Sequence, residues 1–122
     1  MAAKDLYHEA VVKALTDADW NITNDPLRIE VGDVGHEIDL GAEKLIAAEK
    51  ENRKIAVEIK SFLSSSPVYE FHSVLGQFLN YREALAEQEP DRVLYVAVPV
   101  EVYKELFCGS SFSKLFVVTI SG

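Results

Sequence analysis

The run Val93-Leu94-Tyr95-Val96-Ala97-Val98 constrains the fold most, because it is apolar at almost every position. A half-exposed strand alternates apolar and polar residues, whereas a continuously apolar strand is buried on both faces. Such a strand needs other elements on each side of its sheet. With 48% hydrophobic residues spread along 122 positions, the chain is long enough to bury a real core. We therefore expect one α/β domain over residues 1–122.

Hydrophobic periodicity and turn residues divide the chain into further elements. Apolar residues at helical spacing predict helices over 5–19, 69–87 and 100–107. Asn, Asp and Pro between 20 and 26 predict a turn, and the glycines of 32–35 predict a hairpin turn. Strands are predicted over 27–31, 37–40, 55–61, 93–98 and 115–120. The segment 45–49 is a further candidate strand, although its propensity also allows a helix. The predicted order is αβββαβαβ.

The strand Ile55-Ala56-Val57-Glu58-Ile59-Lys60-Ser61-Phe62 carries the main candidate site. Side chains two residues apart on a strand point the same way, so Glu58 and Lys60 share a face opposite the isoleucines. A neighbouring antiparallel strand of matched parity could bring Asp39 opposite Glu58. Two carboxylates with waters suit a divalent metal such as Mg²⁺, and a nearby lysine can orient water or neutralise charge.

The same pattern also has a plain structural interpretation. Amphipathic strands with Glu and Lys on a solvated face are common in antiparallel sheets. Adjacent carboxylates repel each other unless a cation lies between them, which favours a metal or a tight ion pair. Glu49 would replace Asp39 as the second acid if its strand neighbours Glu58, so both alternatives stay open here.

Other candidate residues lie on the predicted helices. Gln77 and Tyr81 are four residues apart on one flank of the long helix, where they would face the carboxylates. The alternative is a solvated Gln and a Tyr at the edge of the core. Glu9 lies nearly opposite the apolar stripe of the first helix, which favours a solvated residue over a third acid. His36 and His72 are isolated in sequence and fit surface or core positions better than a catalytic base.

Composition limits the classes of function. The chain has 20 acidic and 12 basic residues and a net charge of −8, so any contact with DNA is expected to be weak or assisted by a partner. The single cysteine, Cys108, excludes an internal disulfide, and no Cys/His set has the spacing of a zinc site. No apolar run reaches the roughly 20 residues that span a bilayer. We expect no membrane association and a cytoplasmic location.

Several blocks in order resemble the XisH family, the fdxN element excision controlling factors. The resemblance covers roughly residues 1–107 and is carried by the following segments: Lys4-Asp5-Leu6-Tyr7-His8-Glu9-Ala10, Asp25-Pro26-Leu27, Asp39-Leu40-Gly41-Ala42-Glu43-Lys44-Leu45, Ala47-Ala48-Glu49-Lys50, Ile55 to Phe62, Gly76-Gln77 and Glu89-Pro90-Asp91-Arg92. The C-terminal segment from Cys108 to Gly122 departs from the family's pattern.

The resemblance implies a compact PD-(D/E)xK, restriction-endonuclease-like core, with a mixed central sheet flanked by helices. In that fold Asp39 would be the first acid, Glu58 the second acid and Lys60 the lysine of the motif. Ile38 stands where a proline usually precedes the first acid. Glu9 would correspond to the acid of the first helix, and Gln77 with Tyr81 to the helix residues that follow the core.

The resemblance also implies a role in programmed excision of a DNA element during heterocyst development, with a site-specific recombinase and a small XisI-like partner protein. Two functions follow. In the first, a metal-dependent nuclease binds Mg²⁺ or Mn²⁺ through Asp39, Glu58 and the carbonyl of Ile59. In the second, a non-catalytic control factor uses the same scaffold to bind proteins or DNA. A third, structural alternative is a homo-oligomer or hetero-oligomer in which the Glu58-Lys60 face pairs across strands.

Overall fold

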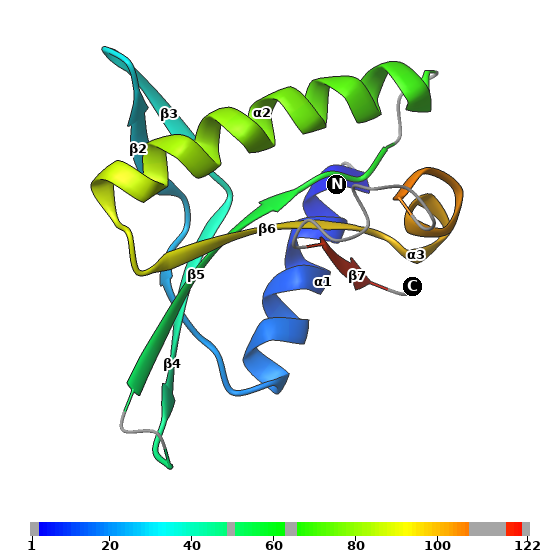
Figure 1. Ribbon diagram of the computed structural model, residues 1–122. Coiled ribbons are helices and arrows are strands. Elements are labelled where there is room, and N and C mark those ends of the chain that lie inside the picture. Colours follow the sequence, from blue (N-terminus) through cyan, green and yellow to red (C-terminus); the bar gives the residue numbers. More distant parts are fainter. Residues whose placement is uncertain (1–2, 49–50, 63–65, 108–116, 121–122) are drawn as a thin grey trace.

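The computed structural model describes residues 3–48, 51–62, 66–107 and 117–120 (Figure 1). The elements in chain order are α1 (Ala3–Asp17), β1 (Asn21–Asn24), β2 (Leu27–Val31), β3 (Val34–Ile38), β4 (Leu40–Ile46), β5 (Glu51–Ile59), α2 (Pro67–Gln88), β6 (Arg92–Pro99), α3 (Val100–Val102), the π-helical turn η1 (Tyr103–Phe107) and β7 (Val117–Ile120). Within these ranges no helix is long and apolar enough to cross a membrane.

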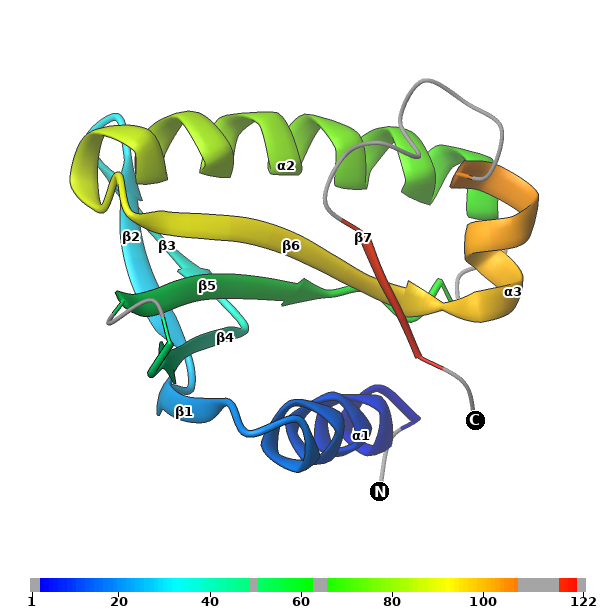
Figure 2. The same ribbon diagram turned by 60° about the horizontal axis from the view of Figure 1, so that its bottom comes forward.

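A five-stranded mixed sheet in the order β1-β4-β5-β6-β7 forms the centre of the fold. The pairs β1–β4 and β4–β5 are antiparallel, whereas β5–β6 and β6–β7 are parallel. The helix α2 covers one face of the sheet and α1 covers the other (Figure 2). The expected mixed sheet flanked by helices is therefore confirmed.

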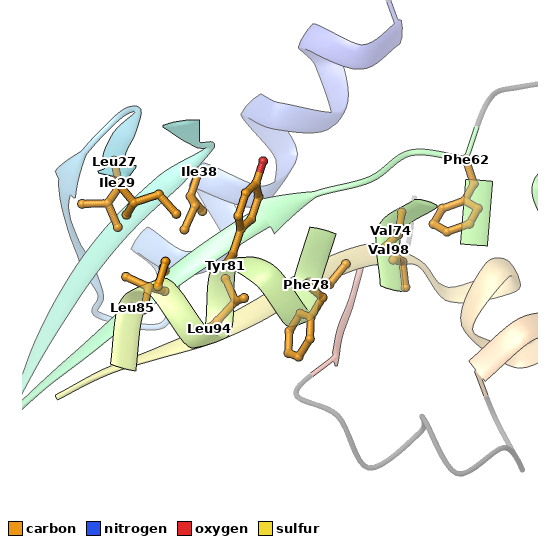
Figure 3. Close-up of a cluster of buried hydrophobic side chains, with 13 residues drawn as sticks. Leu27, Ile29, Ile38, Phe62, Val74, Phe78, Tyr81, Leu85, Leu94 and Val98 are labelled. Atoms are coloured by element: carbon orange, nitrogen blue, oxygen red, sulfur yellow. The ribbon is translucent and has the colours of Figure 1, made fainter. Parts of the chain in front are cut away.

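Two apolar clusters hold the helices to the sheet, one on each face. The cluster under α2 is drawn in Figure 3 and consists of Leu27, Ile29, Ile38, Ala56, Phe62, Val74, Phe78, Tyr81, Ala84, Leu85, Leu94, Val96 and Val98. The cluster under α1 consists of Val11, Leu40, Ala42, Ile55, Val57, Ile59 and Ala97. Along β5 and β6 the buried side chains alternate between the two clusters, as the two-residue period of a strand requires. This explains why β6 is almost continuously apolar.

The hairpin β2–β3 forms a separate two-stranded sheet beside α2. Val31 pairs with Val34, so Gly32 and Asp33 make the turn, and Gly32 has the positive φ of 65° that favours glycine. Gln88, at the end of α2, extends the hydrogen bonding of β2. Its Oε1 accepts the backbone N–H of Glu30 at 3.0 Å, and its Nε2 donates to the Glu30 carbonyl at 2.6 Å. The side-chain amide thus ties the hairpin to the helix.

Arg92 is a buried cation at the start of β6, with 8% of its surface exposed. Its Nη1 donates to the carbonyl of Ile55 at 2.9 Å, and its Nη2 pairs with Glu89 at 3.2 Å. A buried charge is destabilising unless it is hydrogen-bonded and paired, and both conditions are met here. The arginine therefore joins the end of α2 to the middle of the sheet.

Several predicted element boundaries are wrong. The predicted order αβββαβαβ is also wrong, because five strands rather than three lie between α1 and α2. Residues 21–24, within the predicted turn, form β1, because edge pairing with β4 outweighs the low strand propensity of asparagine. The predicted strand 37–40 is divided at Asp39 between β3 and β4, since the chain bends there into a different sheet. The candidate strand 45–49 is the end of β4 followed by a turn at Ala47 and Ala48, and Glu49 lies outside the described residues. Of the predicted strand 115–120, residues 117–120 are described.

Candidate functional site

Asp39 and Glu58 meet where the chain passes from β3 into β4. Leu40 pairs with Val57 in the antiparallel ladder, so Asp39 comes opposite Glu58. The backbone N–H of Asp39 donates to Glu58 Oε1 at 3.2 Å, and the N–H of Ile59 donates to Asp39 Oδ2 at 2.7 Å. The Glu58 carboxyl thus accepts a hydrogen bond from the backbone of Asp39, and the Asp39 carboxyl accepts one from the residue that follows Glu58. The bend at Asp39 is what frees its N–H for Glu58.

Lys60 completes this group on β5. Its Nζ lies 3.8 Å from Glu58 Oε2, and the two side chains are 24% and 11% exposed. The backbone N–H of Lys60 donates to the carbonyl of Ala97 at 2.9 Å, which continues the pairing with β6. Glu58 and Lys60 therefore lie on the face covered by α2, while Val57 and Ile59 pack under α1. The site is partly enclosed and its lysine side chain reaches solvent.

Burial gives Glu58 unusual acid–base behaviour. Desolvation, followed by a hydrogen bond and charge repulsion from Asp39, raises the pKa of Glu58 to about 8, against the lowering effects of Lys60 and of the Asp39 backbone N–H. The carboxyl of Glu58 is accordingly protonated at neutral pH and shares a hydrogen bond with Asp39. A cation bound between the two groups would favour the ionised form and release this proton.

Tyr81 of α2 lies within electrostatic reach of the acid pair, and His36 of β3 packs against Tyr81. Tyr81 is 7% exposed and lies beside Ile38 (Figure 3). Desolvation, followed by the charges of Glu58 and Asp39, raises the pKa of its hydroxyl. The His36 ring packs against Tyr81 with 5.8 Å between centroids. His36 looks isolated in the sequence, although its two-residue spacing from the core residue Ile38 indicates that both lie on one face of β3.

Gln77 lies one helical turn before Tyr81 on α2. Its Oε1 is buried and has no hydrogen-bond partner among the described residues. A buried amide oxygen without a partner is destabilising, so a bound water or ligand at this position would be stabilising. Gln77 and Tyr81 thus lie on one flank of α2, and the charges of Glu58 and Asp39 act on the Tyr81 hydroxyl.

Of the other two candidate acids, one lies apart from this pair and the other lies outside the described residues. Glu9 is exposed on α1, which covers the opposite face of the sheet, and Glu49 falls in the undescribed gap at 49–50. Among described side chains no group of three or more His, Cys, Asp and Glu is placed to hold a metal. The acids assembled here are Asp39 and Glu58.

The donor atoms of this pair fit a hard divalent cation. Two carboxyl groups and the carbonyl of Ile59 offer oxygen only, which Mg²⁺ and Mn²⁺ prefer, and such ions commonly keep several waters besides one or two carboxylates. With two acids a cation would depend on waters and a substrate phosphate for its remaining ligands. A phosphate group of the substrate usually supplies those oxygens.

The fold and site define a class: a mixed α/β protein with a partly buried acid pair beside a lysine on its central sheet. Comparison with known proteins adds the family. The family model described as XisH protein matches residues 1–119, and the chain belongs to the XisH family.

Two solved structures are similar to this chain. One is an XisH family protein from Nostoc punctiforme PCC 73102, with 48% identity, a TM-score of 0.76 and coverage of 88% of this chain and 80% of that one. The other is a fdxN element excision controlling factor protein from Anabaena variabilis, with 48% identity, a TM-score of 0.76 and coverage of 89% and 80%. The comparison with curated proteins gave no significant match.

Proposed function

We propose that this chain is a fdxN-type excision controlling factor that uses a PD-(D/E)xK-type site for metal-dependent phosphodiester hydrolysis. The role in excision rests on 48% identity to the Anabaena variabilis protein described by that name. The observation that supports hydrolysis is the convergence of Asp39, Glu58 and Lys60, with the two acids joined through the backbone. An acid at the start of one strand and Glu-x-Lys on the next follow the order of that nuclease motif.

In this proposal Asp39, Glu58 and the Ile59 carbonyl hold Mg²⁺ or Mn²⁺. The ion would supply charge neutralisation at a phosphodiester and a water activated for attack. Lys60, whose ammonium group lies at the exposed edge of the site, orients that water or stabilises the charge that develops on phosphorus. Gln77 and Tyr81 position the phosphate from α2, and Glu9 would act only from the far side of the sheet.

The net charge of −8 shapes the expected partners. A protein this acidic attracts the phosphate backbone poorly, so binding to DNA is expected to be weak or assisted. A site-specific recombinase and an XisI-like protein are the partners that would bring the site to DNA, within the cytoplasm of a differentiating heterocyst.

The same charge favours a second candidate, a non-catalytic control factor that binds those proteins through a nuclease-like scaffold. Recombinase chemistry conserves phosphodiester energy and needs no additional hydrolase. In that case the protonated Glu58 and its hydrogen bond to Asp39 serve the fold alone.

Metal binding separates the two candidates. We expect Mn²⁺ to bind the native chain in calorimetry at pH 8, and both Asp39→Asn and Glu58→Gln to weaken that binding at least about tenfold, because each removes one anionic ligand. Glu87→Gln, at an exposed position of α2, is the matched control and should bind as the native chain does. Equal binding by all four proteins would place the metal elsewhere, and no binding by the folded native chain would favour the non-catalytic factor.

Measuring DNA cleavage tests the role proposed for Lys60. With Mn²⁺ and branched or linear DNA, Lys60→Ala should lower the cleavage rate by at least about 100-fold, as expected for a group acting in proton transfer or charge stabilisation. Lys13→Ala on α1, where the lysine pairs with Asp17 at 2.7 Å, should leave the rate unchanged. Both variants should retain the native circular dichroism spectrum, and their free energies of unfolding should equal that of the native chain to within about 1 kcal/mol. Cleavage that survives Lys60→Ala excludes this site.

A further inference from the structure

The outer face of α2 carries an ordered stripe of side chains that the sheet does not use. Figure 2 shows α2 as the outermost layer on its side of the sheet. Six residues that point away from the core recur at spacings of three and four, so they form one continuous stripe along the helix. All of them are exposed, and they are Tyr69, His72, Gly76, Leu79, Glu83 and Ala86. Tyr69 is 76% exposed and Leu79 43% exposed, so two large apolar side chains lie in solvent on this stripe.

Nothing within the monomer accounts for a glycine at position 76. It lies in the middle of a 22-residue helix, where glycine costs about 1 kcal/mol relative to alanine. A Cβ at this position would meet nothing within 4 Å, so packing inside the chain does not require glycine. A glycine on the outer face of a helix does allow another backbone or a large side chain to approach closely.

We propose that this stripe binds the same stripe of a second copy, with the two α2 helices antiparallel and the twofold axis between Gly76 and Leu79. In this register each Leu79 packs on the partner's Gly76, and each Tyr69 packs on the partner's Ala86. Each His72 lies opposite the partner's Glu83, where the imidazole can donate a hydrogen bond to the carboxylate. Every large apolar side chain of the stripe therefore faces a small residue, and the one acid of the stripe faces the histidine.

The electrostatics of the helix favour the antiparallel arrangement over a parallel one. The N-terminal end of a helix carries partial positive charge and the C-terminal end partial negative charge. On α2 the exposed acids Glu83 and Glu87 lie in the C-terminal half, and the N-terminal half of the stripe holds Tyr69 and His72. A parallel pair would place Glu83 against Glu83, and like charges at such positions are destabilising.

The size of the contact predicts weak association. A helix of 22 residues is about 33 Å long, and one pair of such helices buries less than the roughly 1,600 Å² of a standard interface. We therefore expect the dimer to form at protein concentrations on the order of 100 µM rather than nanomolar. The surface lies on the outer side of α2, away from the acid pair, and the proposal does not depend on metal binding or cleavage.

The test is a charge exchange measured by sedimentation equilibrium of the full chain. His72→Glu places a carboxylate opposite the partner's Glu83 twice in each dimer, and should weaken association at least about tenfold. Glu83→Lys removes the acid that His72 contacts and should also weaken it. The double variant His72→Glu with Glu83→Lys restores an opposite-charge pair and should associate as well as the native chain or better. Residues 72 and 83 are three helical turns apart on one chain, so this rescue cannot arise within a monomer.

Two further outcomes would overturn the proposal. A native chain that stays monomeric at 1 mM excludes the dimer. Association that is unchanged in both single variants places the interface on another surface, and this includes pairing through the Glu58-Lys60 face. Gly76→Arg provides an independent variant. The monomer has room for a side chain there, whereas in the dimer the arginine would collide with the partner's Leu79. This substitution should abolish association without loss of helix content.

Discussion

Glu58→Gln is expected to stabilise the metal-free protein at pH 9 and to remove most of its loss of stability between pH 5 and pH 8. In the folded chain, burial and Asp39 raise the pKa of Glu58 to about 8, whereas an unfolded chain has the ordinary value near 4.5. Glutamine has nearly the shape of the protonated acid and no charge to bury. It therefore keeps the packing and loses the titration.

The sign follows from proton uptake on folding. Between the two pKa values the folded state holds the proton of Glu58 and the unfolded state does not, so the free energy of unfolding falls as pH rises. The contribution is fully present below about pH 4.5 and is lost by about pH 8. A shift of this size corresponds to an upper limit of about 5 kcal/mol, and we expect roughly 2–4 kcal/mol because relaxation and water penetration around a charged group reduce the cost of burying it.

The measurement is urea unfolding of the native chain and Glu58→Gln from pH 5 to pH 9 without divalent metal. The difference between the two curves isolates Glu58, because all other titrating groups are common to both proteins. Glu87→Gln, which changes an exposed acid on α2, should follow the native pH profile. A constant difference between native and Glu58→Gln across this range would show that Glu58 ionises normally in the fold.

Leu85→Ala is expected to cost about 3 kcal/mol of the free energy of unfolding, and up to about 5 kcal/mol if the cavity does not collapse. Leu85 is 1% exposed in the cluster between α2, the sheet and the β2–β3 hairpin. Removing its three outer carbons loses burial free energy and leaves a void against neighbours that are themselves fixed. For a domain of this size the loss is a large fraction of the total stability, which is typically 5–15 kcal/mol.

Leu45→Ala makes the same chemical change at a position that is 69% exposed on β4. It should shift the free energy of unfolding by less than about 0.5 kcal/mol. Chemical denaturation at pH 6, followed by circular dichroism and tryptophan fluorescence, measures both variants under conditions where Glu58 stays protonated. Equal effects of the two substitutions would mean that the cluster under α2 is not the core of the fold.

The sequence determined the elements whose signals are local. The apolar run of β6 predicted a strand covered on both faces, and the alternation along β5 placed Glu58 and Lys60 together, because the two-residue period belongs to the strand itself. The helical stripes predicted α1 and α2 for the same reason. These patterns need no knowledge of neighbours, and an α/β domain follows from them.

Only the tertiary structure decided where the pieces meet. Pairing with β4 made a strand of residues 21–24, and the bend at Asp39 divided one predicted strand between two sheets. The sequence left α1 free to lie on either side, and the structure places it on the face opposite the acid pair, which leaves Glu9 apart from Asp39 and Glu58. The same packing brings His36 against Tyr81. Periodicity fixes the face on which a side chain lies, but the separation of residues distant in sequence depends on strand order and helix packing, which no local pattern encodes.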